Sequence, residues 1–257
     1  MENNTVKKDN RKALPKYLLI LFVAAIFGGV LGFATGWVGH DNISEVIATA
    51  VSDGLTAAAP WALLVTSVVS LALILWLYRG AKALYTGWDG EDETVMDRAD
   101  EKLNWALLLT AAQLVLDMFF FVAAESGESP LGGIVGFLSF IVSMFLLVFA
   151  QQKIVDLTRQ MNPEKKGSVY DMNFRKKWIE SCDEAEQKQI GQAAYKAYTV
   201  VTTACPILWA ALLMLSYAFH FEVLMPTFIV CLIWLLQQVS YCLECIRLGR
   251  RKERGHI

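Results

Sequence analysis

The stretch that decides the fold is WALLLTAAQLVLDMFFFVAA, which runs from Trp105 to Ala124. All of its residues are apolar except Thr110, Gln113 and Asp117. The hydrocarbon core of a bilayer is about 30 Å thick and needs about 20 apolar residues in a helix that crosses it. The stretch therefore predicts a transmembrane helix that carries one carboxyl group, Asp117, in its interior.

The chain as a whole is also rich in apolar residues. Of its 257 residues, 55% are hydrophobic and 19% are charged, and the mean hydropathy is +0.41. Soluble proteins average about 45–50% apolar and about 25% charged residues. We therefore predict an all-α polytopic membrane helix bundle. Its six predicted transmembrane helices are Tyr17–Val38, Trp61–Tyr78, Trp105–Ala124, Leu131–Ala150, Tyr198–Ala218 and Leu224–Tyr241.

The positive charges divide between the two sides of this topology. All 23 Lys and Arg residues lie in the tails 1–16 and 247–257 or in the loops 79–104 and 151–196. Because cytoplasmic segments carry the excess of Lys and Arg, both termini are predicted in the cytoplasm. We expect a multi-pass protein of the cell membrane. Its six-helix domain, 17–246, would have helical cytoplasmic loops at 79–104 and 151–196 and a basic tail at each end.

The first outer connection, residues 39–60, has a pattern of its own. Apolar residues recur from Ile43 to Val51 at the spacing of an amphipathic helix. Asn42 with Glu45 has the form of a capping box at its start. We expect this helix to lie on the outer leaflet or at the rim of the bundle.

Two further helix starts are predicted in the cytoplasmic loops. Thr94 with Asp97 indicates that the third helix begins well before its span. Ser181 with Glu184 has the form of a capping box, and we expect the helix that follows to run into the fifth span. The acids at 89–93 suit the positive end of a helix dipole, and they lack the spacing of a calcium loop.

A basic segment lies between these starts. Phe174 and Trp178 are four residues apart and flank Arg175, Lys176 and Lys177, which predicts a short amphipathic helix with a basic face. Such clusters bind anionic lipid headgroups, at about 1 kcal/mol per basic residue. The alternative is a docking site for a protein partner. We favour contact with the anionic cytoplasmic leaflet.

Asp117 is the one ionisable residue deep in a predicted span. A charged residue at mid-bilayer costs about 2.5–3.5 kcal/mol on insertion scales, so it raises the hypothesis of a functional site. Gln113 lies on the same helix face, and Gln237 and Gln238 lie in the middle of the sixth span. Two interpretations remain open. Asp117 either packs inward against Gln or Ser side chains, which we favour, or handles protons or cations.

Small residues recur at four-residue spacing in two spans. Ala24, Gly28, Gly32 and Gly36 form such a stripe in the first span, and Gly132 and Gly136 begin a similar one in the fourth. These patterns predict close helix packing, within the bundle or between subunits.

Enzyme motifs are absent from the sequence, including those of zinc proteases, serine hydrolases and nucleotide-binding loops. The pair Cys242 and Cys245 stands without a second pair or a nearby His, so it is weak support for a metal or redox site. We therefore expect no catalytic residues, no metal and no cofactor. The net charge of −2 gives no basic signal for nucleic acid.

The second half of the chain resembles a known family. The segments NPEKKGSVYD (Asn162–Asp171), KKWIESCDEAE (Lys176–Glu186), AAYKAY (Ala193–Tyr198) and SYC (Ser240–Cys242) are similar to a bacterial membrane family known as domain of unknown function number 3169. The first half fits more loosely, through its basic tail, its glycine-rich first span and WDGEDE (Trp88–Glu93). The resemblance implies a multi-span membrane protein and no particular activity.

Two functions follow as hypotheses. The first is a non-enzymatic membrane partner or accessory subunit, for example in peptide export, antimicrobial-peptide immunity or envelope-stress signalling, with a membrane or cytoplasmic protein as partner. The alternative is a small transporter or proton-coupled carrier that uses Asp117. The two differ in whether Asp117 faces a hydrated cavity or a packed contact. The sequence leaves the oligomeric state open.

Overall fold

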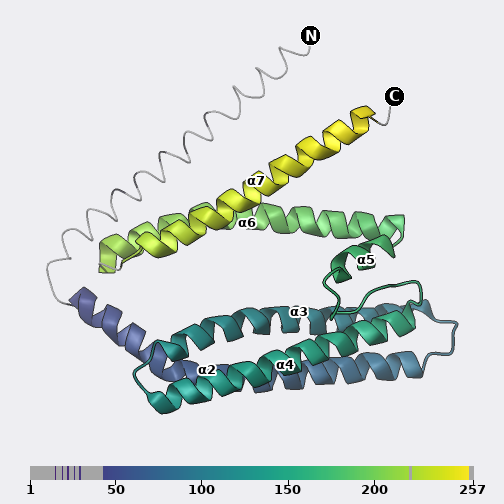
Figure 1. Ribbon diagram of the computed structural model, residues 1–257, viewed down its shortest axis with the longest axis horizontal. Coiled ribbons are helices and arrows are strands. Elements are labelled where there is room, and N and C mark those ends of the chain that lie inside the picture. Colours follow the sequence, from purple (N-terminus) through teal and green to yellow (C-terminus); the bar gives the residue numbers. More distant parts are fainter. Residues whose placement is uncertain are drawn as a thin grey trace, which may run out of the picture. The chain divides into compact units, whose positions relative to one another are not determined.

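The computed structural model describes residues 43–219 and 222–254, with Pro15, Leu19, Phe22, Ile26 and Gly29 as isolated helical positions. Among these residues every regular element is a helix, which confirms the predicted all-α fold. The helices, shown in Figure 1, are α2 (Ile43–Thr86), α3 (Glu93–Glu125), α4 (Pro130–Met161), α5 (Phe174–Glu180), α6 (Glu184–Phe219) and α7 (Leu224–Arg254).

Five helices in the described part are long and apolar enough to cross a membrane. They are α2, α3, α4, α6 and α7, and they contain the predicted spans from the second to the sixth. The chain is thus a helical membrane protein. Most of the first predicted span, Tyr17–Val38, lies outside the described residues, so the count of six spans and the positions of the termini stay predictions.

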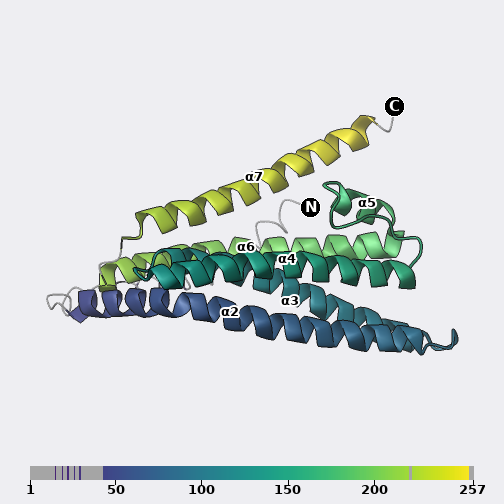
Figure 2. The same cartoon turned by 60° about the horizontal axis from the view of Figure 1, so that its bottom comes forward.

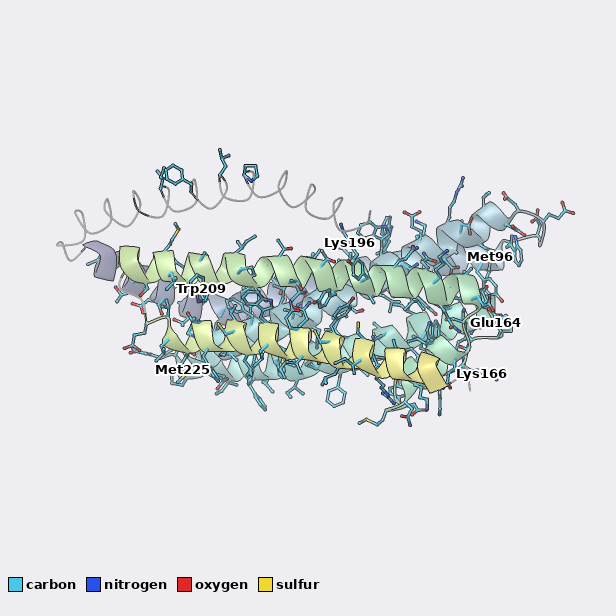
Figure 3. All side chains as sticks on the ribbon, turned by 90° about the horizontal axis from the view of Figure 1, so that it is seen from above. Met96, Glu164, Lys166, Lys196, Trp209 and Met225 are labelled. Atoms are coloured by element: carbon cyan, nitrogen blue, oxygen red, sulfur yellow. The ribbon has the colours of Figure 1, made fainter. Side chains whose placement is uncertain are left out.

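The chain divides into two compact units. The first, Ala50–Gln192, is called here the three-helix unit, because α2, α3 and α4 run side by side in both views (Figures 1 and 2). The other unit contains the chain from Ala193 onward together with residues 1–49. Its described helices, α6 from Ala193 and α7, form a helical hairpin, and Trp209 and Met225 lie toward its turn (Figure 3).

The core of the three-helix unit is built from side chains that α2, α3 and α4 turn toward one another. Its buried members are Ile74, Ala81, Ala99, Leu103, Ala106, Leu147, Ile154, Leu157 and Met161. They lie toward the end of the unit that carries the Lys and Arg residues of the loops, which we call the basic end. A second cluster, Ala59, Ala123 and Ala124, lies toward the opposite end. Because its members are alanines, the helices approach closely there.

The helix predicted within residues 39–60 is present, but it is continuous with the second span. Helix α2 continues from Ile43 through Pro60 to Thr86. Proline has no N–H, so the carbonyl of Thr56 loses its helical partner. That carbonyl oxygen lies beside Gly127, where an added Cβ would be 3.5 Å from it. Membrane helices tolerate proline where neighbouring segments compensate for the lost bond. The predicted cap, Asn42, lies outside the described residues.

Helix α3 does begin ahead of its span, but the cap differs from the predicted one. The backbone N–H and the hydroxyl of Thr94 both donate to Asp92 Oδ1, at 2.9 and 2.7 Å. The hydroxyl bond and the backbone bond hold the pKa of Asp92 below its ordinary value. Asp92 is therefore the N-cap, and Thr94 is already inside the helix.

The cap of α6 is also shifted by two residues. The N–H of Glu186 donates to Asp183 Oδ1 at 2.8 Å, and the N–H of Asp183 donates to Glu186 Oε2 at 3.0 Å. This reciprocal pair is a capping box that starts at Asp183. The predicted cap, Ser181, instead donates its hydroxyl to Trp178 O, at 2.7 Å. As predicted, α6 runs on into the fifth span.

Candidate functional site

Asp117 lies in the middle of the three-helix unit and is 0% exposed. It is on α3, and it receives hydrogen bonds from all three helices. Ser67 Oγ of α2 is 3.0 Å from Asp117 Oδ1, and Ser143 Oγ of α4 is 2.5 Å from Asp117 Oδ2. Gln113 Nε2, one turn earlier on α3, donates to Asp117 Oδ1 at 2.7 Å. The carboxyl group thus connects α2, α3 and α4 at one level.

Gln113 extends this network along α2. Its Oε1 accepts a bond from Ser70 Oγ at 2.7 Å, and its Nε2 lies 3.3 Å from both Thr66 Oγ1 and Ser67 Oγ. The side chain is 1% exposed. We call Asp117, Gln113, Ser67, Ser70 and Ser143 the Asp117 network.

The Asp117 carboxyl group can be fully hydrogen-bonded whether it is ionised or neutral. A serine hydroxyl carries one proton, and Ser67 Oγ lies 2.7 Å from Leu63 O as well as 3.0 Å from Asp117 Oδ1. An ionised carboxylate can accept the proton of Ser67. A neutral carboxyl group can donate its own proton to Ser67 Oγ, while Ser67 bonds Leu63. Either form is hydrogen-bonded without water, so the network can serve as a packing contact.

Sequence reasoning missed most partners of Asp117. The sequence predicted Gln or Ser partners for Asp117, but it did not identify Ser67 or Ser143. A signal was present, because Thr66, Ser67 and Ser70 place three hydroxyls within about one turn of an apolar span. Polar side chains in a membrane helix usually bond to neighbouring helices, so such a cluster predicts a polar partner.

The other predicted intramembrane residues, Gln237 and Gln238, bond to α6. Tyr198 Oη donates to Gln238 Oε1 at 2.7 Å, and Gln237 Nε2 donates to Tyr198 O at 2.8 Å. The ring of Tyr198 stacks on Tyr241, with centroids 4.4 Å apart. Gln237 Oε1 has no hydrogen-bond partner within the described part of the chain. These contacts hold the helical hairpin together.

Of the two predicted stripes of small residues, the structure describes only the one in the fourth span. A Cβ added at Gly136 would be 2.7 Å from Ala124 Cβ, so α3 and α4 make a close contact there. At Gly132 the nearest atoms, Pro60 Cγ and Ser129 Cβ, would be 3.4 Å away. Ala24, Gly28, Gly32 and Gly36 lie outside the described residues.

The basic segment forms α5, as its spacing predicts. Its Trp178 is half-buried and lies 5.5 Å from the ring of Phe174, so it packs within the loop. Lys177 pairs with Asp171, and this bond holds the pKa of Asp171 below its ordinary value. Lys176 Nζ is 3.9 Å from Glu180 Oε1. Within the described residues Arg175 has no ion pair, so α5 presents less free charge than its sequence predicts.

A buried lysine holds the loop that contains α5. Lys165 is 5% exposed, forms an ion pair with Glu186 of α6, and lies 3.5 Å from Cys182 Sγ. Burial alone would lower the pKa of Lys165. The bond to Glu186 and the sulfur of Cys182 outweigh burial and raise it. Figure 3 labels the flanking residues Glu164 and Lys166 at the basic end of the three-helix unit. No pattern in the sequence distinguishes Lys165, the buried lysine, from the other eight cationic residues of this loop.

Replacing Lys165 by Met should loosen this loop. The change leaves Glu186 partly buried without its cation, and we expect a local loss of about 1–2 kcal/mol, below the value for a fully buried pair because Glu186 is 40% exposed. Limited proteolysis of the purified protein should cut within residues 162–183 several-fold faster. Lys166→Met, at the exposed neighbouring position, is the control. Equal cutting of both variants would contradict the structural role of Lys165.

No group of three or more His, Cys, Asp or Glu residues that could hold a metal ion occurs among the residues described. Cys242 and Cys245 are both exposed on α7. The described residues thus offer no donor set for a metal.

Comparison with known proteins identifies one family. The family described as "Protein of unknown function (DUF3169)" matches residues 11–245. No curated protein and no solved structure matches the chain.

Proposed function

We propose that this chain, which belongs to the DUF3169 family, is a non-enzymatic partner subunit of the membrane, with a role in peptide export, antimicrobial-peptide immunity or envelope-stress signalling. The observation that supports this role over transport is the enclosure of Asp117. Its carboxyl group is 0% exposed and bonded to side chains of three helices. A carboxyl group that serves helix packing has no need of access to water.

The loop at the basic end supplies a surface for such a partner. Lys165 and Glu186 fix the loop, and around α5 it exposes Tyr170 (66%), Met172 (100%) and Ile179 (44%) beside Arg175. Exposed apolar side chains next to a cation are typical of an interaction surface. We call these four residues the α5 surface.

Photo-crosslinking in cells tests this proposal. A benzophenone amino acid at Met172 should give one discrete protein adduct. The same amino acid at Lys188, an exposed position on α6 that is not part of the α5 surface, should not. Adducts to lipid alone from Met172 would mean that the α5 surface anchors the chain to the membrane, and would contradict the partner role.

The alternative function is a small transporter or proton-coupled carrier. One observation favours it: Ser67 and Ser143, which bond Asp117, also line a groove of about 320 Å³ between α2 and α4. Two hydroxyls therefore lie between the carboxyl group and the surface of the three-helix unit.

Purified protein in liposomes that enclose a pH-sensitive dye separates the two functions. Under an imposed pH gradient, we expect the rate of proton leak into the liposomes to be the same for the wild type and for Asp117→Asn. Asparagine cannot ionise, so a proton flux present in the wild type and lost in Asp117→Asn would make the carrier function primary.

A further inference from the structure

A second groove between α2 and α4 lies toward the basic end and plays no part in the function proposed above. Its volume is about 400 Å³, and its lining includes Leu71, Ile74, Tyr78, Leu146, Phe149 and Lys153. It adjoins the serine-lined groove, because Leu71 and Leu146 line both. Apart from Tyr78 and Lys153 at one end, its lining is apolar.

The dimensions of this groove limit what can fill it. From Leu71 to Tyr78 it follows α2 for about 10 Å, at 1.5 Å per residue. A thin, flexible apolar chain fits a groove of this length and of about 400 Å³.

The end of the groove carries an available positive charge. Lys153 is exposed, and its Nζ lies 5.3 Å from the centroid of the Phe149 ring. No carboxylate of the described residues forms an ion pair with it. The next acid along α4, Asp156, accepts a bond from Gln152 instead. The hydroxyl of Tyr78 makes no hydrogen bond within the described part. A cation and a phenol that line the same groove complement a phosphate group.

The depth of these groups in the membrane agrees with such a ligand. The predicted second and fourth spans end at Tyr78 and Ala150, so Tyr78 and Lys153 lie at the predicted level of the cytoplasmic headgroups. Tyrosine and lysine are both favoured at that level. The apolar part of the groove lies at the level of the acyl chains. An empty groove there would lose van der Waals contacts on its open side.

We propose that this groove binds one anionic glycerophospholipid of the cytoplasmic leaflet. An acyl chain lies between α2 and α4 against Leu71, Ile74 and Leu146, and the phosphate group bonds Lys153 and Tyr78. The site is separate from the α5 surface and from the Asp117 network.

Native mass spectrometry of the full chain in detergent, titrated with dioleoyl phosphatidylglycerol or dioleoyl phosphatidylcholine, tests the proposal. The wild type should retain one phosphatidylglycerol and prefer it over phosphatidylcholine. Lys153→Gln keeps the length of the side chain and removes its charge, so the preference should fall about fivefold or more. Lys188→Gln removes an exposed lysine elsewhere and should keep the preference of the wild type.

A second variant tests the apolar part of the site. Ala150 lines the groove, and Ala150→Phe should fill it and weaken the binding of both lipids. An equal preference for phosphatidylglycerol in Lys153→Gln and Lys188→Gln would overturn the proposal. Unchanged lipid binding in a folded Ala150→Phe would also overturn it. If Ala150→Phe fails to fold, the two lysine variants decide.

Discussion

Replacing Gly136 by alanine is expected to destabilise the three-helix unit by about 1–3 kcal/mol, the usual cost of overpacking a well-packed contact. The added Cβ would lie 2.7 Å from Ala124 Cβ. Both atoms are attached directly to the helix backbone, so no rotamer change separates them, and α3 and α4 must move apart. Unfolding of the purified protein in mixed micelles, followed against denaturant concentration, measures the loss.

Two matched variants identify the cause of that loss. At Gly133, three residues earlier on α4, an added Cβ meets only Glu125 Oε1, at 3.8 Å. Gly133→Ala should therefore keep or slightly raise stability, because alanine is the better helix former. The double variant Ala124→Gly with Gly136→Ala moves the methyl group to the other helix and should restore most of the loss. Equal stabilities of Gly133→Ala and Gly136→Ala would show that the close contact is absent.

Asp117→Leu should produce the second large effect. Leucine removes the acceptor of three bonds, from Ser67, Gln113 and Ser143. Hydrogen bonds between membrane helices contribute about 0.6 kcal/mol each on average and about 1.7 at most, so the three together predict a loss of about 2 kcal/mol or more. The same unfolding measurement applies. A stability equal to that of the wild type would mean that the three donors find other partners.

Asp117→Asn is the control for shape. Its carbonyl oxygen can still accept from Gln113 and Ser67, and its amide can donate to Ser143, because a hydroxyl oxygen also accepts. Asn should therefore stay within about 0.5 kcal/mol of the wild type, the range of substitutions that remove no specific interaction. A loss as large as that of leucine would show that the carboxyl group itself, and not its shape, stabilises the contact.

The sequence by itself determined the fold class and most of the helices. Long apolar stretches such as Trp105–Ala124 predict spans because the thickness of the bilayer sets their length, whatever their neighbours are. Helix α5 could also be predicted, since the Phe174–Trp178 spacing acts locally. Asp117 and Gln113 were identified as intramembrane polar residues from their position in a span alone.

The sequence predicted the helix caps only approximately. The N-caps are Asp92 and Asp183, whereas the predicted caps were Thr94 and Ser181. All four residue types are common at helix N-caps, so the sequence offered two candidates for each helix. A capping oxygen has to face the free N–H groups of the first turn, and the path of the preceding loop decides which candidate does. The continuation of α2 through Pro60 depends in the same way on the space beside Gly127.

Only the tertiary structure decided which residues meet. Ser67 and Ser143 lie 50 and 26 residues from Asp117, and Lys165 lies 21 residues from Glu186. The apolar residues of a span do not fix its rotation about the helix axis, because lipid and protein interior solvate Leu and Val about equally well. The rotations of α2, α3 and α4 are set by the contacts they make together: the methyl-to-glycine approach at Ala124 and Gly136, and the polar groups that must find partners away from water.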